Sequence, residues 1–299
     1  YDSGKFYIGT DQTFTGVWSS GGNLPASKYG PAGAGTQSAG LCVGGWSGGG
    51  VVNTVEEYNG SSWSAGGALT TARQYFAACG TQSSALAIAG WTTEFSSTCE
   101  EYNGTAWSAG GAIAAGKANN GGTGTQTAAL CFGGATTGGT KSSTNEEYDG
   151  TSWSSANAIS SARSYITGAG TQTAGLAIGG STGSASNITQ EYDGTSWTSG
   201  GNLVTARWGL SSAGTQSAAL NFAGAPPEGP GVTNTEEYDG TSWSAGGALT
   251  TARYIAAGTG TQSAGLCMGG YASAVLDSTE EYAPGAGSYD EMFSAVGGL

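Results

Sequence analysis

Short apolar segments alternate with polar, glycine-rich turns along the whole chain, and the same order of segments returns every 44 to 46 residues. In one copy, residues 163–170 (RSYITGAG) and 173–180 (TAGLAIGG) carry small apolar side chains in the alternation of buried strands. Residues 234–238 (NTEEY) and 243–249 (WSAGGAL) illustrate the other two segments. The pattern predicts four short strands per unit, here named a, b, c and d in chain order.

The markers of this unit occur six times. A tyrosine ends each predicted strand c, and a tryptophan begins each predicted strand d: Tyr58, Tyr102, Tyr148, Tyr192, Tyr238 and Tyr282; Trp18, Trp63, Trp107, Trp153, Trp197 and Trp243. A period of about 40 to 50 residues that holds four strands is typical of β-propeller blades. The sequence predicts an all-β, six-bladed β-propeller over residues 14–283, with four antiparallel strands per blade, an N-terminal extension at 1–13 and a tail at 284–299.

The copies at the two ends of the chain are incomplete in complementary ways. Trp18 precedes the first complete set of a, b and c segments, whereas the last copy ends after its c segment at Tyr282. We expect the N-terminal strand d to complete the C-terminal blade, because this pairing leaves no large open sheet edge in the ring.

The turn between c and d has its own signal. Asn-Gly or Asp-Gly follows the tyrosine in five of the six copies, as in YDGTSW at residues 238–243. Such a pair readily supplies the two positive-φ positions of a two-residue hairpin turn. The sequence therefore predicts a tight turn at this place in the blade.

Composition and charge narrow the function. The chain has 57 glycines among 299 residues and only 10% charged residues, which is typical of neither a helical protein nor an ordinary α/β enzyme. Its formal net charge is −13, and its eight Lys and Arg residues are too few for a nucleic-acid or anionic-membrane surface. No run of 18 apolar residues is present, so we expect no membrane insertion.

The order of a basic residue, a Gly-Gly pair, a tyrosine and a tryptophan five residues later resembles the kelch repeat over about residues 14–283. The wording of the units, such as GTQTAALCFGG and EEYNGSSWSAGGAL, is similar to the glycine-rich kelch-like arrays of marine phage, especially cyanophage, virion or tail-associated proteins. This resemblance implies a β-propeller in a virion, at an extracellular location.

The residue inventory excludes several chemistries. The chain has no histidine, which removes the copper site of the galactose oxidase class, Ser-His-Asp and Cys-His catalysis, and His-bearing zinc sites. Six-bladed sialidases carry an S-x-D-x-G-x-x-W box in the same turn, but here the glycine follows the aspartate directly, as in Asp149-Gly150. We expect no enzyme, no catalytic residue, no metal and no cofactor.

Acidic pairs precede the tyrosine of the predicted c strand in five copies, as Glu56-Glu57 in the first, and Gln190-Glu191 takes their place in the fourth. Neighbours on a strand point to opposite faces, and a six-fold repeat does not suit one specialised active site. We interpret the pairs as structural, with the second glutamate bonded to the Thr or Gln side chain of the GTQ motif. A glycan-active enzyme that uses carboxylates alone is the weakest alternative.

One repeat position holds Cys42, Cys131 and Cys267 in three copies and Ala87, Ala177 and Asn221 in the others. A position that accepts alanine as readily as cysteine is most simply a small buried packing site.

Six of the eight basic residues occupy one repeat position, seven residues before the glycine of GTQ: Lys28, Arg73, Lys117, Arg163, Arg207 and Arg253. We expect them to form a ring near the channel mouth, on the face of the b–c loops, with the strand c glutamates toward the other face. Aromatic residues follow closely, Trp208 among them, so the ring could hold an acidic ligand or a sugar. Alternatively, the cations bind carbonyls or neighbouring carboxylates and hold the blades together.

The predicted b–c loops are the least repetitive parts of the chain, and Trp46, Trp91 and Tyr271 begin three of them. Loops on a rigid scaffold can vary for binding without cost to the core. The alternative is that these aromatic side chains only cap the sheet edge.

Two functions stay open. The first is a non-enzymatic virion or tail-associated propeller that binds a host-surface glycan or a partner protein through its b–c loop face. The second is a structural docking or decoration module of a larger assembly, which docks through the tail at residues 284–299. The expected partners are accordingly other virion proteins or a host-surface glycan or protein.

Overall fold

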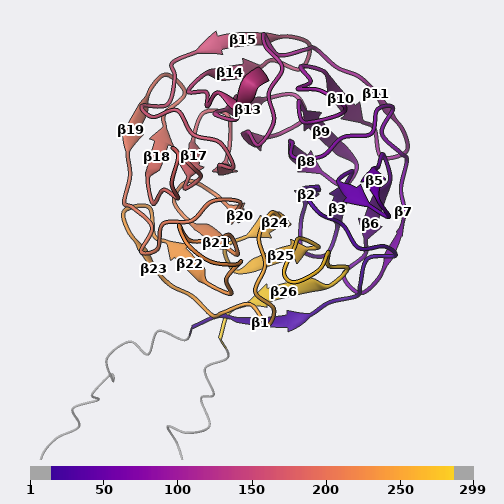
Figure 1. Cartoon of the computed structure of the whole chain (residues 1–299), viewed down its shortest axis with the longest axis vertical. Coiled ribbons are helices and arrows are strands. Elements are labelled where there is room, and N and C mark those ends of the chain that lie inside the picture. The colour runs from indigo at the N-terminus through magenta and orange to yellow at the C-terminus, as the bar shows by residue number, and fades with distance from the viewer. Residues whose placement is uncertain (1–14, 286–299) are drawn as a thin grey trace, which may run out of the picture.

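The computed structural model describes residues 15–285. These residues form six four-stranded antiparallel sheets around a central axis, a six-bladed β-propeller (Figure 1). The described residues contain no α-helix, only one turn of 3₁₀-helix, η1 (Thr137–Gly139). The predicted fold class is confirmed, whereas the expected extension at 1–13 and residues 286–299 of the expected tail lie outside the described residues.

Each blade uses its strands in the predicted order from the axis outward. The innermost strands, a, are β2 (Ala32–Gly35), β8 (Ala77–Thr81), β12 (Gly121–Gly124), β16 (Thr167–Gly170), β20 (Ser211–Gly214) and β24 (Ala257–Thr261). The b strands are β3 (Gly40–Val43), β9 (Ser84–Ile88), β13 (Ala129–Phe132), β17 (Gly175–Ile178), β21 (Ala219–Phe222) and β25 (Ala264–Met268).

The outer half of each blade is equally regular. The c strands are β6 (Val55–Tyr58), β10 (Cys99–Tyr102), β14 (Asn145–Tyr148), β18 (Thr189–Tyr192), β22 (Thr235–Tyr238) and β26 (Thr279–Ala283). The d strands are β7 (Trp63–Ala65), β11 (Trp107–Ala109), β15 (Trp153–Ala156), β19 (Trp197–Ser199), β23 (Trp243–Ala245) and β1 (Val17–Ser20). One b–c loop adds a small hairpin of β4 (Trp46–Ser47) and β5 (Gly50–Val51).

The core lies between neighbouring blades. The strands β3, β13, β17 and β21 are buried along their whole length, because each b strand is covered by a blade on either side. Their side chains are therefore small or apolar on both faces. Cys42, Cys131 and Cys267 are fully buried free thiols at this level, so the predicted packing role of their position is confirmed.

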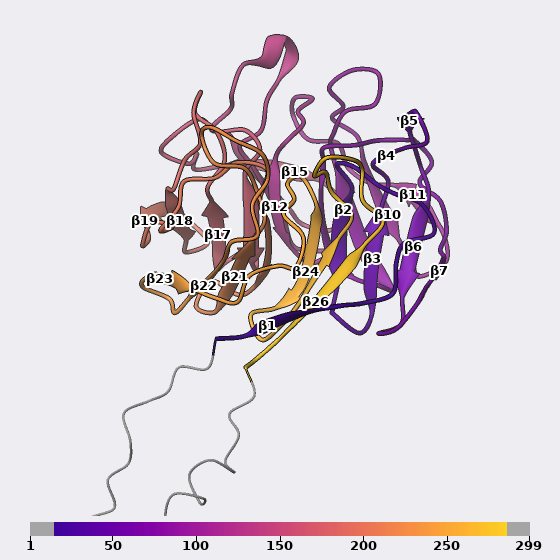
Figure 2. The same cartoon turned by 60° about the horizontal axis from the view of Figure 1, so that its bottom comes forward.

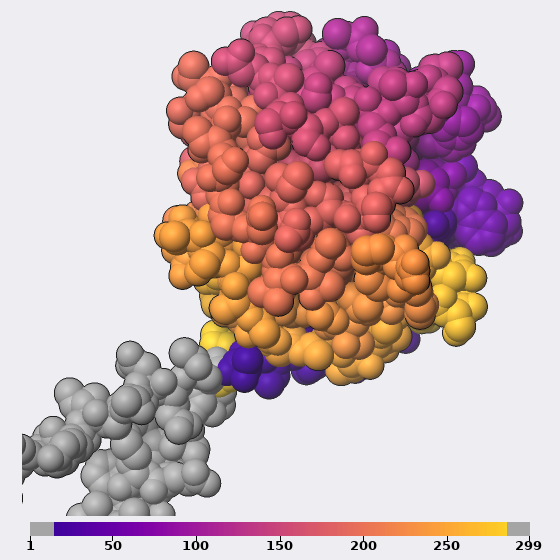
Figure 3. Space-filling view, turned by 60° about the vertical axis from the view of Figure 1, so that its left-hand side comes forward, coloured from indigo at the N-terminus to yellow at the C-terminus, as the bar shows by residue number. Residues whose placement is uncertain are grey.

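The ring closes through the N-terminal strand, as the two incomplete copies predicted. β1 pairs with β26, and Trp18 lies opposite Tyr282. The indole Nε1 of Trp18 donates a hydrogen bond of 2.9 Å to Thr235 Oγ1 in the neighbouring blade. In Figure 3 the indigo N-terminal strand lies directly below the orange segments of the last blades.

The two faces of the disc differ in what they carry. Strand c runs from the b–c loop to the c–d turn, so β26 and its partner β1 bring both ends of the described chain to the face of the a–b and c–d turns. Figure 2 shows β1 at the bottom of the disc and the b–c loops, with β4 and β5, at the top. The loop face is thus the face opposite the chain ends.

The c–d turn differs from its prediction. Tyr58 pairs with Trp63, so four residues rather than two connect the strands. Asn59 Oδ1 accepts hydrogen bonds from the backbone N–H groups of Ser61 and Ser62, at 3.0 and 2.9 Å. The turn is still a tight one, because the N–H of Asn59 donates to the carbonyl oxygen of Ser62 at 3.1 Å. The expected pair of positive-φ residues is wrong, because only Gly60 has a positive φ, of 89°, and the Asn59 side chain caps the turn instead.

Candidate functional site

The repeated polar residues outside the loop face join neighbouring blades. The phenol of Tyr102 donates a hydrogen bond of 2.6 Å to Glu57 of the preceding blade. The same bond recurs around the ring in Tyr58–Glu281, Tyr148–Glu101, Tyr192–Glu147, Tyr238–Glu191 and Tyr282–Glu237. The second glutamate of each pair is structural, but the expected GTQ partner was wrong, because the tyrosine of the next blade occupies the carboxylate.

The glutamine of GTQ makes a different contact between blades. Gln82 Nε2 donates to the carbonyl oxygens of Gly40 and Tyr58 in the preceding blade, at 3.1 and 2.7 Å. The equivalent glutamines are Gln37, Gln126, Gln172, Gln216 and Gln262. Each glutamine bonds backbone carbonyls near the start of strand b and at the tyrosine of strand c, so the turn face is fixed by contacts that every blade repeats.

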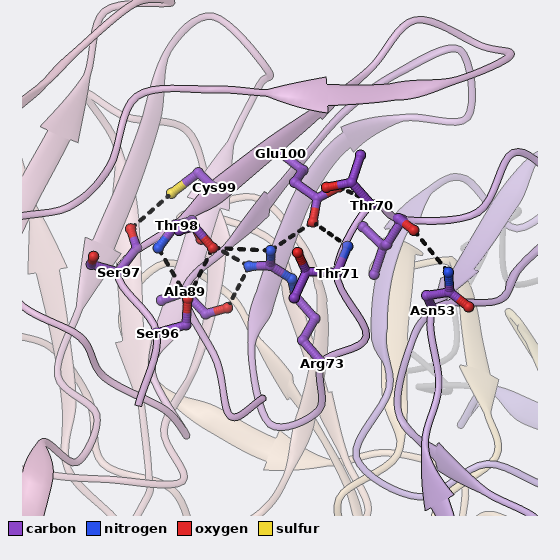
Figure 4. Close-up of polar contacts among 11 residues, drawn as sticks. Asn53, Thr70, Thr71, Arg73, Ala89, Ser96, Ser97, Thr98, Cys99 and Glu100 are labelled. Atoms are coloured by element: carbon purple, nitrogen blue, oxygen red, sulfur yellow. Dashed lines mark hydrogen bonds and ion pairs between the residues drawn. The ribbon is translucent and has the colours of Figure 1, made fainter. Parts of the chain in front are cut away.

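The basic residue of each unit points into its own blade. Arg73 is 0% exposed, and its Nη1 donates to the carbonyl oxygens of Ala89 and Thr98, both at 2.8 Å (Figure 4). Its Nη2 lies 2.7 Å from Glu100 Oε1. Ala89 follows strand b and Thr98 precedes strand c, so the guanidinium group bridges the two ends of the b–c loop.

The contacts therefore favour the alternative in which the cations bind carbonyl oxygens and carboxylates, although the carboxylates belong to their own blade and not to a neighbouring one. The same ion pair recurs with Glu56, Glu146, Glu236 and Glu280, and the six cations are at most 1% exposed: Lys28, Arg73, Lys117, Arg163, Arg207 and Arg253. A buried cation requires a carboxylate and several hydrogen bonds to offset its desolvation, and these are found inside the blade. The strand c glutamate also lies within reach of its own blade's cation, contrary to expectation.

The fourth blade departs from this pattern. Gln190 stands where the other blades have glutamate, and its Oε1 accepts a hydrogen bond of 3.0 Å from Arg163 Nη2. Burial lowers the pKa of Arg163 to about 10, since the amide supplies no negative charge. Arg163 is thus a buried cation without an ion pair among the described residues.

A constant backbone platform carries variable side chains on the loop face. In every blade the residue after the buried cation forms an antiparallel bridge with the first residue of the b–c loop. The six pairs, named here the bridge pairs, are Tyr29–Trp46, Gln74–Trp91, Ala118–Ala135, Ser164–Ser181, Trp208–Ala225 and Tyr254–Tyr271. The third and fourth blades carry small pairs, whereas the other four, contiguous in the ring, each carry at least one aromatic residue.

The next residue in each blade lies at the channel mouth in the left-handed region. Tyr75, Tyr165 and Ile255 have φ values of 54°, 54° and 51°, and Gly30 and Gly209 occupy the same position without strain. Backbone N–H groups donate around the mouth from one blade to the next, as from Tyr75 to Gly30 at 3.0 Å. Strain of about 1–3 kcal/mol at a tyrosine is typical of functional sites, which makes this mouth a candidate.

The aromatic bridge pairs enclose a pocket of about 460 Å³ over the sixth, first and second blades. The aromatic pocket, as we name it, is lined by Tyr29, Trp46, Gln74, Tyr75, Tyr254, Tyr271 and Val275. Its rings meet edge to face, with centroids 5.5 Å apart for Tyr29 and Tyr75 and 5.6 Å apart for Tyr29 and Tyr271. The volume is in the range of small-ligand sites, about 300–1,000 Å³.

The predicted loop residues divide around this pocket. Trp46 and Tyr271 line it, whereas Trp208 packs edge-on against Tyr254 at 5.3 Å just outside. Trp91 lies outside as well, 5.0 Å from the ring of Phe95.

Sequence reasoning missed Gln74 and Val275 as lining residues. The signal for Gln74 was its place directly after the basic residue, because that position faces the first loop residue in every blade.

The central channel beneath the pocket offers little chemistry. Two cavities of about 120 and 150 Å³ occupy its upper and lower halves. Strand a residues line both, joined in the upper cavity by the segments just before these strands, and none of the lining residues has a carboxylate or cationic side chain. Small residues such as Gly33, Ala78 and Gly122 line the waist shared by both cavities. No cluster of three metal-ligating side chains occurs between residues 15 and 285.

Comparisons with known proteins agree with the fold. No protein-family model and no curated protein matches the chain. A solved structure titled "Structure of YjhT" is similar, with a TM-score of 0.73 and 14% identity over 86% of this chain and 95% of that chain. At this identity the likeness shows a shared propeller fold alone. Within the described part of the chain, no helix is long and apolar enough to cross a membrane.

Proposed function

We propose that this chain is a non-enzymatic propeller of the kelch type, associated with a virion or its tail, that binds a host-surface glycan through the aromatic pocket. The pocket is the observation that carries the proposal. Aromatic faces stack against the apolar faces of sugar rings, and a few polar groups between them bond the hydroxyls. Sugar recognition of this kind requires no catalytic group.

The placement of the pocket supports a role in recognition. It lies on the loop face, opposite the ends of the described chain, so attachment through those ends leaves the pocket open to a partner (Figure 2). Arg73 and the equivalent Arg163, Arg207 and Arg253 each bond both ends of their b–c loop, so loop sequences can change while the bridge pairs stay in place. The similarity of the repeat units to phage arrays supports the virion association.

Two matched pairs of variants on a glycan array test the binding site. Trp46→Ala and Trp91→Ala remove the first residue of two b–c loops, and only Trp46 lines the pocket. Tyr75→Gly and Tyr165→Gly relieve the same left-handed conformation, and only Tyr75 lines the pocket. We expect glycan binding to fall at least ten-fold in the first member of each pair and to change little in the second. Equal losses in both members would place the site elsewhere.

Imaging of the particle that carries this chain tests the association. We expect the turn face to be covered by other virion proteins and the loop face to be open. A loop face covered by another protein, together with no response on the array, would favour a structural docking module instead.

A further inference from the structure

We infer that the aromatic pocket selects uncharged saccharides over acidic ones, and that Gln74 distinguishes the hydroxyl pattern of the bound ring. This inference rests on the proposed glycan-binding function and names its ligand class. It follows from the charges in and around the pocket and from the one amide side chain in its wall.

The pocket wall carries no formal charge. None of its seven lining residues is a carboxylate, a lysine or an arginine. Lys28 and Arg73 are the chain neighbours of Tyr29 and Gln74, but both are buried in ion pairs, with Lys28 Nζ 2.5 Å from Glu56. Burial raises the pKa of Tyr29, so this phenol stays neutral. A carboxylate or sulfate group on a sugar would therefore lose water without gaining a counter-charge.

The surface around the pocket repels anions. Outside the repeat position of the buried cations, Lys141 is the one lysine or arginine among residues 15–285, and it lies in the loop of the third blade. The loop face carries Glu94, Glu228 and Asp277 as well, in a chain of formal net charge −13. Approach of an acidic saccharide is opposed over a distance of about 10 Å at moderate salt.

Gln74 supplies the one amide side chain of the pocket wall. Its side chain is 9% exposed, and its Oε1 is buried with no hydrogen-bond partner among the described residues. A buried acceptor without a partner is costly, and a ligand that donates to it recovers that cost. Because an amide carries one acceptor and two donors, it suits a pair of neighbouring sugar hydroxyls. In this arrangement the aromatic rings stack on the face of the sugar, and the amide forms hydrogen bonds with the hydroxyls at its edge.

Matched glycan pairs test the charge preference. Lactose is compared with sialyllactose, and methyl-esterified oligogalacturonides with the free acids, alongside a wider glycan array, by titration at 50 and 500 mM NaCl. We expect the array hits to be neutral glycans, the uncharged member to bind better wherever a pair binds, and the affinity for neutral glycans to change less than two-fold with salt. Preference for acidic members, or binding that weakens steeply with salt, would overturn the inference while leaving glycan binding intact.

Lysine substitutions sharpen the test. Val275→Lys places a cation in the pocket wall, and Val204→Lys places the same charge at an exposed position outside it. We expect Val275→Lys to shift selectivity toward acidic saccharides by about five-fold or more, and Val204→Lys to leave it unchanged. Equal shifts in the two variants would mean that the overall charge, not the pocket, sets the preference.

Gln74→Leu tests the hydroxyl readout on the best neutral glycan of the array, with thermal unfolding as a check of folding. We expect the affinity to fall about three- to ten-fold. Monodeoxy analogues of this glycan each lack one hydroxyl. The wild type should bind one of these analogues more weakly than the parent glycan, whereas the variant should bind that analogue and the parent equally well. An unchanged deoxy profile would refute the role of Gln74, and absence of binding to every glycan would refute both this inference and the proposed function.

Discussion

The two faces of the disc use the same repeat in opposite ways. On the turn face, the tyrosines, second glutamates and GTQ glutamines make identical contacts at all six blade boundaries. On the loop face, the bridge pairs keep one backbone geometry and change their side chains from Ala–Ala to Tyr–Trp. Residues that repeat hold the ring together, whereas the residues that line the aromatic pocket vary from blade to blade.

Two tryptophans give the largest expected contrast between the faces. Trp18 is 7% exposed and closes the ring, whereas Trp91 is half-buried in a loop. Trp18→Ala should lower the free energy of unfolding by about 3–5 kcal/mol, because it opens a cavity at the closure. Trp91→Ala should cost about 1 kcal/mol. Urea unfolding measures both, and similar losses would contradict the difference between the faces.

The second and fourth blades differ in the partner of their buried arginine, and exchanging that partner between the two blades tests how much the ion pair stabilises the ring. Glu100→Gln gives the second blade the partner that Arg163 has in the fourth, and we expect a loss of about 2–3 kcal/mol. Gln190→Glu supplies the missing carboxylate, and we expect a gain of about 1–2 kcal/mol at pH 7. Thermal and urea unfolding of both variants provide the measurement. Loss of stability in Gln190→Glu would show that the fourth blade is adapted to the amide.

Alkaline pH should act on the turn-face contacts. Burial, together with the bond to a carboxylate, raises the pKa of Tyr58, Tyr148 and Tyr238 to about 12. These phenols ionise near 10 in the unfolded chain, so their contribution is fully present below pH 10 and is lost between pH 10 and 12. Tyr238→Phe should cost about 1 kcal/mol at pH 7 and flatten this decline. The measurement is the free energy of unfolding from pH 8 to 12. A constant value over this range would contradict the role given to these tyrosines.

The smallest effects should come from exposed positions in the b–c loops. Ser273→Ala and Glu228→Ala should each change the free energy of unfolding by less than about 0.5 kcal/mol, since both side chains are exposed. Urea midpoints equal to the wild type are the expected result. A larger loss at either position would mean that the loops also hold the ring together.

The sequence predicted the ring more fully than the pocket. Tyr58 and its five equivalents mark the blades because every boundary imposes the same packing, and Trp18 without its own blade revealed the closure. The position of Arg73 was also visible, but its burial was not, because only the folded blade brings Glu100 and the loop-end carbonyls around it. Gln74 went unnoticed because only the packing of neighbouring blades brings it to the pocket that Tyr29 lines.

The pairing of β1 with β26 also has a consequence for biosynthesis. Among the described strands β1 is translated first, and its partner strand β26 is translated last. At about 5–20 residues per second, β1 waits on the order of tens of seconds with an unsatisfied edge and an indole exposed to water. The last blade can be completed only after β26 has been translated, so β1 should be a chaperone-binding segment of the nascent chain until that point.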